Sequence, residues 1–366
     1  MNYTLELNSA RKDADFCTQK MHSKSPVVEI FSAMVEGKDL SKYGKGADKV
    51  TAHIKSLAQR AELNDFNAIA ELNTIKKYAI EPKLMEEMKL LGLFGTYENL
   101  GYGESIEREV YGYEGEMSRM QALGGDVVFP TIVETKYPVN TVSIGAGYAV
   151  DYRKLQLGDM SKENEMMNQI RIDIRNKAAK YVISKAYDAI KNATGVKYFA
   201  EGAGITKSAV DDMVKKIRRF GKTSLLGDYS VVSQVNEFAP YQSISTGVNG
   251  ISDVALEEIR KTSLLSAYNG SNIVEIPNGY DFTTRTADGS NFGTILPEGI
   301  LFVVPTGTDS PIKSWTRGGI TTFTGNDVST GKVMTRFDIE LATDVAKGQE
   351  YKLGVISDTN FEIPTV

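Results

Sequence analysis

A single long run of helical periodicity, residues 159–195, limits the architectures open to this 366-residue chain more than any other feature. Its apolar residues recur at steps of three or four, the spacing of one face of an α-helix: Met167, Ile170, Ile174, Ala178 and Tyr181. At 1.5 Å per residue the predicted helix is on the order of 50 Å long. It is about three times as long as the mean helix of globular proteins, which has about 11 to 12 residues. We expect the apolar face of this rod to be covered by a second copy of the chain.

Residues 104–150, upstream of the helix, are strand-like, with a glycine-containing stretch at 114–126. Apolar and small residues alternate over 141–150, the two-residue period of a strand. We expect 104–150 to form one long β-hairpin, with Pro130 at an edge or a bulge. Because a two-stranded hairpin is marginal alone and leaves unpaired edges, it needs a neighbouring chain.

The remaining segments favour an α+β fold. Residues 1–100 are helical in character, with apolar stripes at Val50, Ile54, Leu57 and Ala61, and at Phe66, Ile69, Leu72 and Ile75. Residues 205–305 mix the two kinds of element, with helices over Ser208–Phe220 and Val254–Leu265 and strands over Tyr229–Val235, Ile273–Ile276 and 300–304. The last sixty residues return to strands, among which we expect Trp315 to be a packing anchor.

The residues that carry most catalytic and metal chemistry are scarce. The chain has one cysteine, Cys17, and two histidines, His22 and His53, which we expect at the surface of an N-terminal helical segment. This argues against Ser/His and Cys/His catalysis and against the common zinc sites. We predict no catalytic, cofactor-binding or metal-binding residue and expect no enzyme, although catalysis by carboxylates alone stays open.

Charge and hydropathy add two exclusions. A net charge of −5 is not that of a generic nucleic-acid binder. No run approaches the roughly 18 apolar residues of a membrane span, and the N-terminus lacks the apolar stretch of a secretory signal. We therefore expect a soluble protein, made in the cytoplasm.

Gly221-Lys222-Thr223 has the form of the end of a phosphate-binding loop. Such a loop lies between a preceding strand and a following helix, whereas here helical spacing precedes the Gly-Lys pair and strand-like residues follow it. We interpret Gly221 as the residue that ends a helix, with basic residues near the negative end of the helix dipole.

Four segments, in this order, resemble the major capsid proteins of tailed bacteriophages, which share the Hong Kong 97-type fold. They are KYPVNTVSIGAGYAVDYRKLQLGD (136–159) running into the long helix, LLGDYSVVSQV (225–235), and ILFVVPTGTDSPIKSWTRGGITTF (300–323) with GKVMTRFDIELATDVAKGQEYKLGVI (331–356). The resemblance implies an N-terminal helical arm (1–103) that clasps neighbours, an extended hairpin loop over an adjacent subunit (104–150), a peripheral domain with a spine helix (151–204 and 306–366) and an axial α/β domain (205–305).

The function implied by the resemblance is a coat protein that assembles through pentamers and hexamers into an icosahedral shell around double-stranded DNA. The subunit would be made in the bacterial cytoplasm, end in the virion, and meet DNA without sequence specificity, together with portal, scaffold or decoration proteins. Some relatives join copies by a lysine–asparagine bond; we expect Lys136 to be an ordinary solvated lysine and not such a partner of Asn326. The alternative is an encapsulin-like nanocompartment shell that encloses cargo enzymes.

Overall fold

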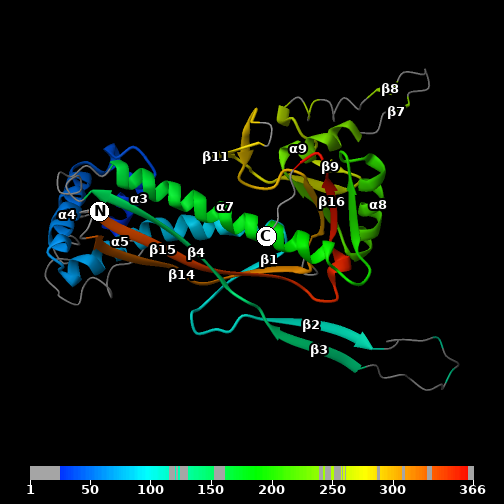
Figure 1. Cartoon of the computed structure of the whole chain (residues 1–366), viewed down its shortest axis with the longest axis horizontal. Helices are drawn as coiled ribbons and strands as arrows, with labels where there is room; N and C mark the ends of the chain where they lie inside the picture. The colour runs from blue at the N-terminus through cyan, green and yellow to red at the C-terminus, as the bar shows by residue number, and fades with distance from the viewer. Residues whose placement is uncertain are drawn as a thin grey trace.

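The computed structural model describes residues 25–114, 131–151, 161–238, 261–286, 289–306, 310–327 and 332–361, with positions 120, 123, 242–243, 249–250, 257 and 259 in between. These residues form an elongated molecule (Figure 1). A peripheral unit built on one long helix occupies one end, and a mixed α/β unit occupies the other. A two-stranded hairpin projects from the side of the molecule near the junction of the two units. The predicted α+β class, and the predicted order of helices, hairpin, long helix, α/β unit and returning strands, are confirmed.

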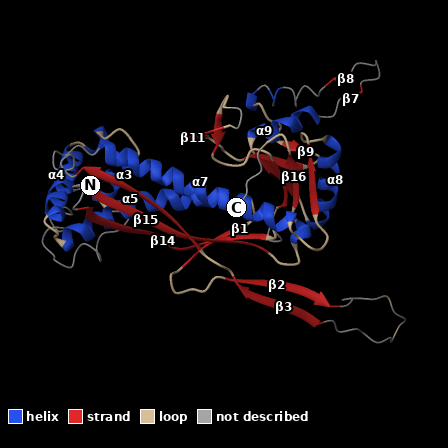
Figure 2. Ribbon diagram, viewed as in Figure 1, coloured by secondary structure: helices blue, strands red, loops and turns tan. Residues whose placement is uncertain are grey.

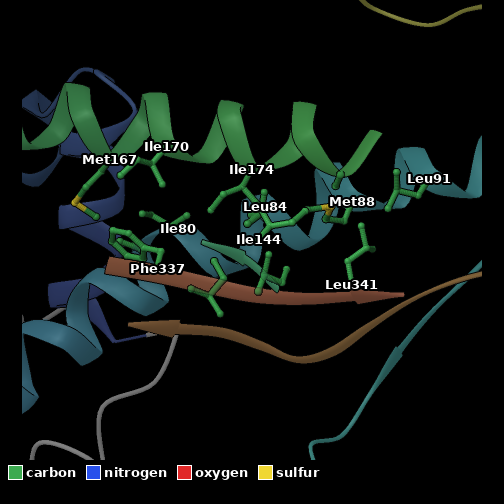
Figure 3. Packing of buried hydrophobic residues seen from close by; sticks show 14 of the residues in the cluster. Ile80, Leu84, Met88, Leu91, Ile144, Met167, Ile170, Ile174, Phe337 and Leu341 are labelled. Atoms are coloured by element: carbon green, nitrogen blue, oxygen red, sulfur yellow. The ribbon is translucent and has the colours of Figure 1, made fainter. Parts of the chain in front are cut away.

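The long helix is α7, Ser161–Lys191, whose 31 residues confirm the predicted rod. Its apolar stripe is buried: Met167, Ile170, Ile174, Ala178, Val182, Ala186 and Ile190. Figure 3 shows the first three of these facing Ile80, Leu84 and Met88 of one helix and Phe337 of a strand. Burying each large aliphatic side chain stabilises the fold by about 1.5–3 kcal/mol. The expectation that a second copy covers this rod is therefore wrong, because the subunit buries the stripe by itself.

The N-terminal part contains three helices, α3, Pro26–Val35, α4, Lys45–Glu62, and α5, Phe66–Met88. Helices α3 and α5 contact α7, whereas α4 packs on α3 and α5. Helix α5 begins where it does because the Asp65 carboxylate accepts hydrogen bonds from the backbone N–H groups of Asn67 and Ala68. The predicted stripe from Val50 to Ala61 is buried, as are Leu72 and Ile75, whereas Phe66 is 83% exposed. Since α3 and α5 pack against α7, residues 26–88 belong to the body of the subunit and are not a free arm.

The other wall of the peripheral unit is a four-stranded sheet in the order β1-β14-β15-β4. Its strands are β1, Thr96–Leu100, β14, Ile312–Asp327, β15, Lys332–Val345, and β4, Val142–Asp151. β4 pairs antiparallel with β15 over ten residues, from Leu341 opposite Val142 to Lys332 opposite Asp151. The predicted strand over 141–150 is thus present, but it belongs to this sheet and not to the hairpin.

The projecting hairpin is shorter than expected and consists of β2, Glu107–Glu114, and β3, Thr131–Pro138. Pro130 lies outside the described residues.

The α/β unit is built on a six-stranded sheet in the order β5-β16-β13-β6-β10-β9. The strands are β5, Tyr198–Gly202, β16, Gly354–Asp358, β13, Ile300–Pro305, β6, Thr223–Gly227, β10, Ser271–Glu275, and β9, Ala267–Tyr268. Helix α8, Lys207–Ile217, packs against this sheet through Val210, Met213 and Val214. Every residue of β6, β13 and β16 is buried, as expected for central strands covered on both faces.

One strand predicted in this unit is wrong. Residues 229–235 form helix α9, Tyr229–Val232, followed by the 3₁₀ helix η4, Ser233–Phe238. The Asp228 carboxylate accepts a hydrogen bond of 2.9 Å from the Ser230 N–H and so caps a helix at this point. The neighbouring strand is instead β6, just before it. Of the helix predicted over Val254–Leu265, positions 257, 259, 261 and 262 are helical and 263–265 are not, while residues 254–256, 258 and 260 lie outside the described residues.

Figure 2 shows how helices and strands separate into layers. The remaining elements of the described chain are short. They are η1, Ser41–Tyr43, η2, Lys89–Leu93, η3, Arg218–Phe220, η5, Glu350–Lys352, β7, Gln242–Ser243, β8, Asn249–Gly250, β11, Tyr280–Arg285, and β12, Phe292–Thr294.

A buried polar cluster joins α5, α7, β4 and β15. Lys76 Nζ lies 2.7 Å from Glu163 Oε1 and donates a 3.0 Å hydrogen bond to Thr335 Oγ1. The Tyr148 hydroxyl donates to the same Glu163 oxygen at 2.7 Å, and burial, with the adjacent Glu163 charge, raises the pKa of Tyr148 well above its usual value. The side chains of Lys76 and Glu163 are 3% and 2% exposed, so each charge depends on the other.

His53 is buried, contrary to the expectation of two surface histidines. Its Nε2 lies 2.7 Å from Glu71 Oε1, between helices α4 and α5. His22 and Cys17 lie outside the described residues.

Candidate interaction surface

The hairpin has two chemically different faces. β2 and β3 pair from Glu107 opposite Pro138 to Glu114 opposite Thr131. Opposed residues share a face and successive residues alternate, which separates the side chains into two sets. One set, the acidic face, contains Glu107, Glu109, Tyr111, Ile132, Glu134 and Lys136. The other set, the anchor face, contains Arg108, Val110, Gly112, Val133, Thr135 and Tyr137.

Little of the hairpin is buried within its own chain. In β3, Tyr137 alone is partly buried and the other seven residues are exposed. Large apolar side chains stand in solvent along its length and at the two described positions of its tip: Tyr111, Ile132, Met120 and Leu123. Met120 and Leu123 are as exposed as in an extended peptide. A two-stranded ribbon of this kind lacks a core of its own and leaves both edges open for pairing.

The base of the hairpin, in contrast, is held firmly to the subunit. Arg108 Nη2 donates a 3.0 Å hydrogen bond to the carbonyl of Pro311. The Tyr137 hydroxyl donates to Asp344 Oδ2 at 2.7 Å and accepts from the Lys347 N–H at 3.1 Å. The ammonium group of Lys347 also lies 4.6 Å from the centre of the Tyr137 ring. The anchor face therefore points toward the body, and the acidic face points away from it.

These anchors change the titration of the groups that make them. Burial raises the pKa of Tyr137 to about 12, and the bond to Asp344 adds to the shift. Burial likewise raises the pKa of Asp344 above its usual value, although the Tyr137 hydroxyl and Arg108 oppose that change.

A small apolar cluster completes the base. Ile106, Trp315 and Ala342 are buried together, with Leu100 and Val139 packed against them. Trp315 is 2% exposed, which confirms it as a packing anchor. The hairpin base covers it on the outer face of the four-stranded sheet.

Lys136 lies on the acidic face between two carboxylates, 2.6 Å from Glu107 Oε2 and 3.2 Å from Glu109 Oε1. Hydrogen bonds to these two groups raise the pKa of Lys136 to about 12. Asn326 lies in a different sheet, near the end of β14, opposite Val333. Within one chain the two residues are thus on separate elements. The expectation of an ordinary solvated lysine, with no bond to Asn326, stays a prediction.

The Gly-Lys-Thr stretch has the structure of a helix end and not of a phosphate loop. Helix α8 and η3 precede Gly221, whose φ of 149° ends the helical segment, and strand β6 begins at Thr223. The Thr223 hydroxyl is buried and bonded to that of Ser271. The carbonyl of Lys222 accepts from the backbone N–H and the hydroxyl of Thr306. These groups are committed to the sheet and do not converge on a ligand.

The described part of the chain offers no enclosed cavity large enough for a small-molecule ligand. Two crevices hold about 10 and 40 Å³, and the smaller has room for about one water molecule. A larger depression of about 710 Å³ opens widely on the outer face of the sheet, next to Gly145 and Phe323. Among the described residues no group of three or more His, Cys, Asp or Glu side chains is placed to hold a metal ion. None of the described helices is both long and apolar enough to cross a membrane.

Sequence comparison finds one family. Residues 7–357 match the family model described as "SPbeta prophage-derived putative capsid protein YonB". No curated protein matches the chain.

Solved structures with a related architecture come from several particles. A structure from Mycobacterium phage Patience shares 11% identity at a TM-score of 0.49, covering 75% of this chain and 85% of that chain. The bacteriophage PhiM1 mature capsid shares 12% identity at 0.45, covering 74% and 87%. A virus-like particle from Pyrococcus furiosus shares 10% identity at 0.43, covering 76% and 97%. Since these TM-scores are below 0.5, the family assignment rests on the sequence match.

Proposed function

The chain belongs to the YonB family of prophage-derived capsid proteins, and we propose that its copies assemble through pentamers and hexamers into an icosahedral shell around double-stranded phage DNA. In this proposal the α/β unit, residues 205–305 with strands β5 and β16, is the axial domain around the symmetry axes. Residues 151–204 and 306–366 contribute the peripheral domain with its spine helix α7. Because α3 and α5 pack on that helix and α4 packs on α3 and α5, we assign residues 26–88 to the peripheral domain as well.

The observation that carries the proposal is the hairpin, which is fixed at its base and exposed on both faces beyond it. A ribbon with open edges and apolar side chains in solvent is a liability for a free protein. A neighbouring subunit that covers it removes that liability. Contacts of this head-to-tail kind are heterologous, and they generate closed rings when the rotation between copies closes.

The role is mechanical and not enzymatic. The subunit is made in the bacterial host and ends in the virion, where the inner surface of the shell meets packaged DNA through its phosphates and without base readout. Portal, scaffold or decoration proteins are further partners in such a particle.

Expression of the chain, followed by light scattering and electron microscopy, tests the proposal. We expect megadalton shells or capsomers, and, in particles from phage-infected or prophage-induced cells, double-stranded DNA inside. A small stable oligomer under all assembly conditions would contradict the capsid role. Shells that contain co-purifying enzymes and no nucleic acid would instead support the nanocompartment function.

A further inference from the structure

The C-terminal end of helix α8 concentrates positive charge on the surface of the α/β unit. Residues 207–222 contain six basic and two acidic residues. Five of the basic residues form a continuous exposed group, here called the basic rim: Lys215, Lys216, Arg218, Arg219 and Lys222. Of these, Lys216 pairs with Asp212 at 2.6 Å, and Arg218 donates to the carbonyl of Asn269. Lys215, Arg219 and Lys222 form no ion pair with any residue that the structure describes.

The helix dipole does not account for so many cations. The C-terminal end of a helix carries about half a negative charge, and one or two nearby cations are enough to offset it. Five cations within eight residues exceed that need several-fold and repel one another. An anionic partner would offset this repulsion.

The hairpin carries the opposite charge. Residues 107–138, from the start of β2 to the end of β3, contain six acidic and three basic residues, a net charge of −3, against +4 for residues 207–222. On the acidic face, Glu107 and Glu109 share one lysine, while Glu134 has no ion-pair partner among the described residues. The charges of Glu134 and Glu109 raise the pKa of Tyr111 above its usual value, and Lys136 opposes them.

The two surfaces do not meet within one chain. No ion pair joins the hairpin to α8 in the described residues, and the anchors at Arg108 and Tyr137 hold the base of the hairpin on the four-stranded sheet. Figure 1 shows the hairpin projecting from the side of the molecule, apart from α8, which lies on the α/β unit. The acidic face, pointing away from the body, is free to reach another molecule.

We propose that the acidic face of one copy's hairpin docks on the basic rim of a neighbouring copy. This contact rests on the proposed shell function and identifies the surface that receives the hairpin. Exposed ion pairs contribute little affinity singly, but complementary charge steers encounter and fixes the orientation of the partners. Tyr111 and Ile132, on the same face, add apolar area at the contact.

Charge reversal tests the contact. Lys215→Glu with Arg219→Glu should slow assembly by at least about 10-fold at low salt, within the range by which electrostatic steering changes association rates. The matched control is Lys45→Glu with Lys89→Glu, two exposed lysines of the peripheral unit that give the same change in charge; we expect assembly within about 2-fold of the wild type, since steering acts through the local field. Adding Glu109→Lys and Glu134→Lys to the rim variant should restore most of the rate, because the complementary pairing returns with its signs exchanged.

Light scattering gives the rate, electron microscopy the product, and circular dichroism the fold of each variant. If the rim variant assembles at the wild-type rate while a chain with a shortened hairpin does not assemble, this docking is wrong and the shell function stands. If the rim variant forms normal shells that retain less DNA, the rim contacts phosphate and the docking is again wrong. If the exchanged-charge variant stays as slow as the rim variant, the two surfaces are not partners. Absence of any particle from the wild-type chain would overturn the shell function itself.

Discussion

Replacing Lys76 by methionine should destabilise the subunit severely. Methionine keeps most of the aliphatic volume of lysine but removes the ammonium group that lies 2.7 Å from Glu163. The Glu163 carboxylate would then be 2% exposed, with the Tyr148 hydroxyl as its remaining hydrogen-bond partner among the described residues. Breaking one side of a buried ion pair costs about 3–5 kcal/mol, because the other charge stays buried without compensation. Such a loss is a large part of the roughly 5–15 kcal/mol that stabilises a typical domain.

A double variant distinguishes the interaction between Lys76 and Glu163 from the contacts that each residue makes with the rest of the core. Lys76→Met with Glu163→Leu removes both charges, and a buried pair replaced by apolar residues of similar volume often costs little or even stabilises. We therefore expect the double variant to be more stable than Lys76→Met alone, with a coupling free energy of about 2–3 kcal/mol in a double-mutant cycle. Urea unfolding followed by circular dichroism measures both quantities. A loss below about 1 kcal/mol for Lys76→Met, or additive effects in the double variant, would refute the reasoning.

Four further predictions concern the hairpin base and the surface. Trp315→Ala should lower the free energy of unfolding by about 3–5 kcal/mol and speed amide exchange at the hairpin base, because a fully buried indole is lost; unchanged exchange would contradict its anchoring role. The phenol of Tyr137, measured as the difference in ultraviolet titration between the wild type and Tyr137→Phe, should titrate near pH 12. Since its folded pKa is raised, its contribution to stability is complete below about pH 10 and lost as the pH rises from 10 to 12. Asp344→Asn should become more stable relative to the wild type as the pH rises through the raised pKa of Asp344, which pH-dependent unfolding checks. Leu63→Ser with Phe66→Ser should leave subunit stability within about 0.5 kcal/mol per residue, because both side chains are more than 80% exposed; a larger loss in urea unfolding would mean that they pack within the subunit.

The sequence predicted the long helix well because one apolar stripe persists through it, but it did not reveal what covers that stripe. Periodicity identifies which face of a helix is buried, but it does not identify the element that packs on that face. The same limit explains β4: alternation over 141–150 indicates a strand, while its pairing with β15 depends on residues almost two hundred positions away. Likewise, nothing local indicated that Arg108 and Tyr137 anchor the hairpin.

Two errors had local signals that were available. His53 lies three residues after Val50 and four before Leu57, so it shares their buried face despite its polar neighbours in the sequence. Lys76 lies four residues after Leu72 and four before Ile80, so it also shares the buried face of its helix. The β-branched residues of 229–235 favoured a strand, but Asp228 is a good helix N-cap and the structure uses it as one.

Shortening the hairpin tests the central claim most directly, because the account separates a self-sufficient subunit from a ribbon that serves contacts between copies. Residues 111–134 are replaced by Asn-Gly, a two-residue turn that fits the register between Val110 and Thr135 and keeps the anchors. We predict the unfolding curve and the circular dichroism spectrum of the wild-type subunit, together with complete loss of shells and capsomers in light scattering. Normal particles from this variant, or an unfolded subunit, would contradict the account.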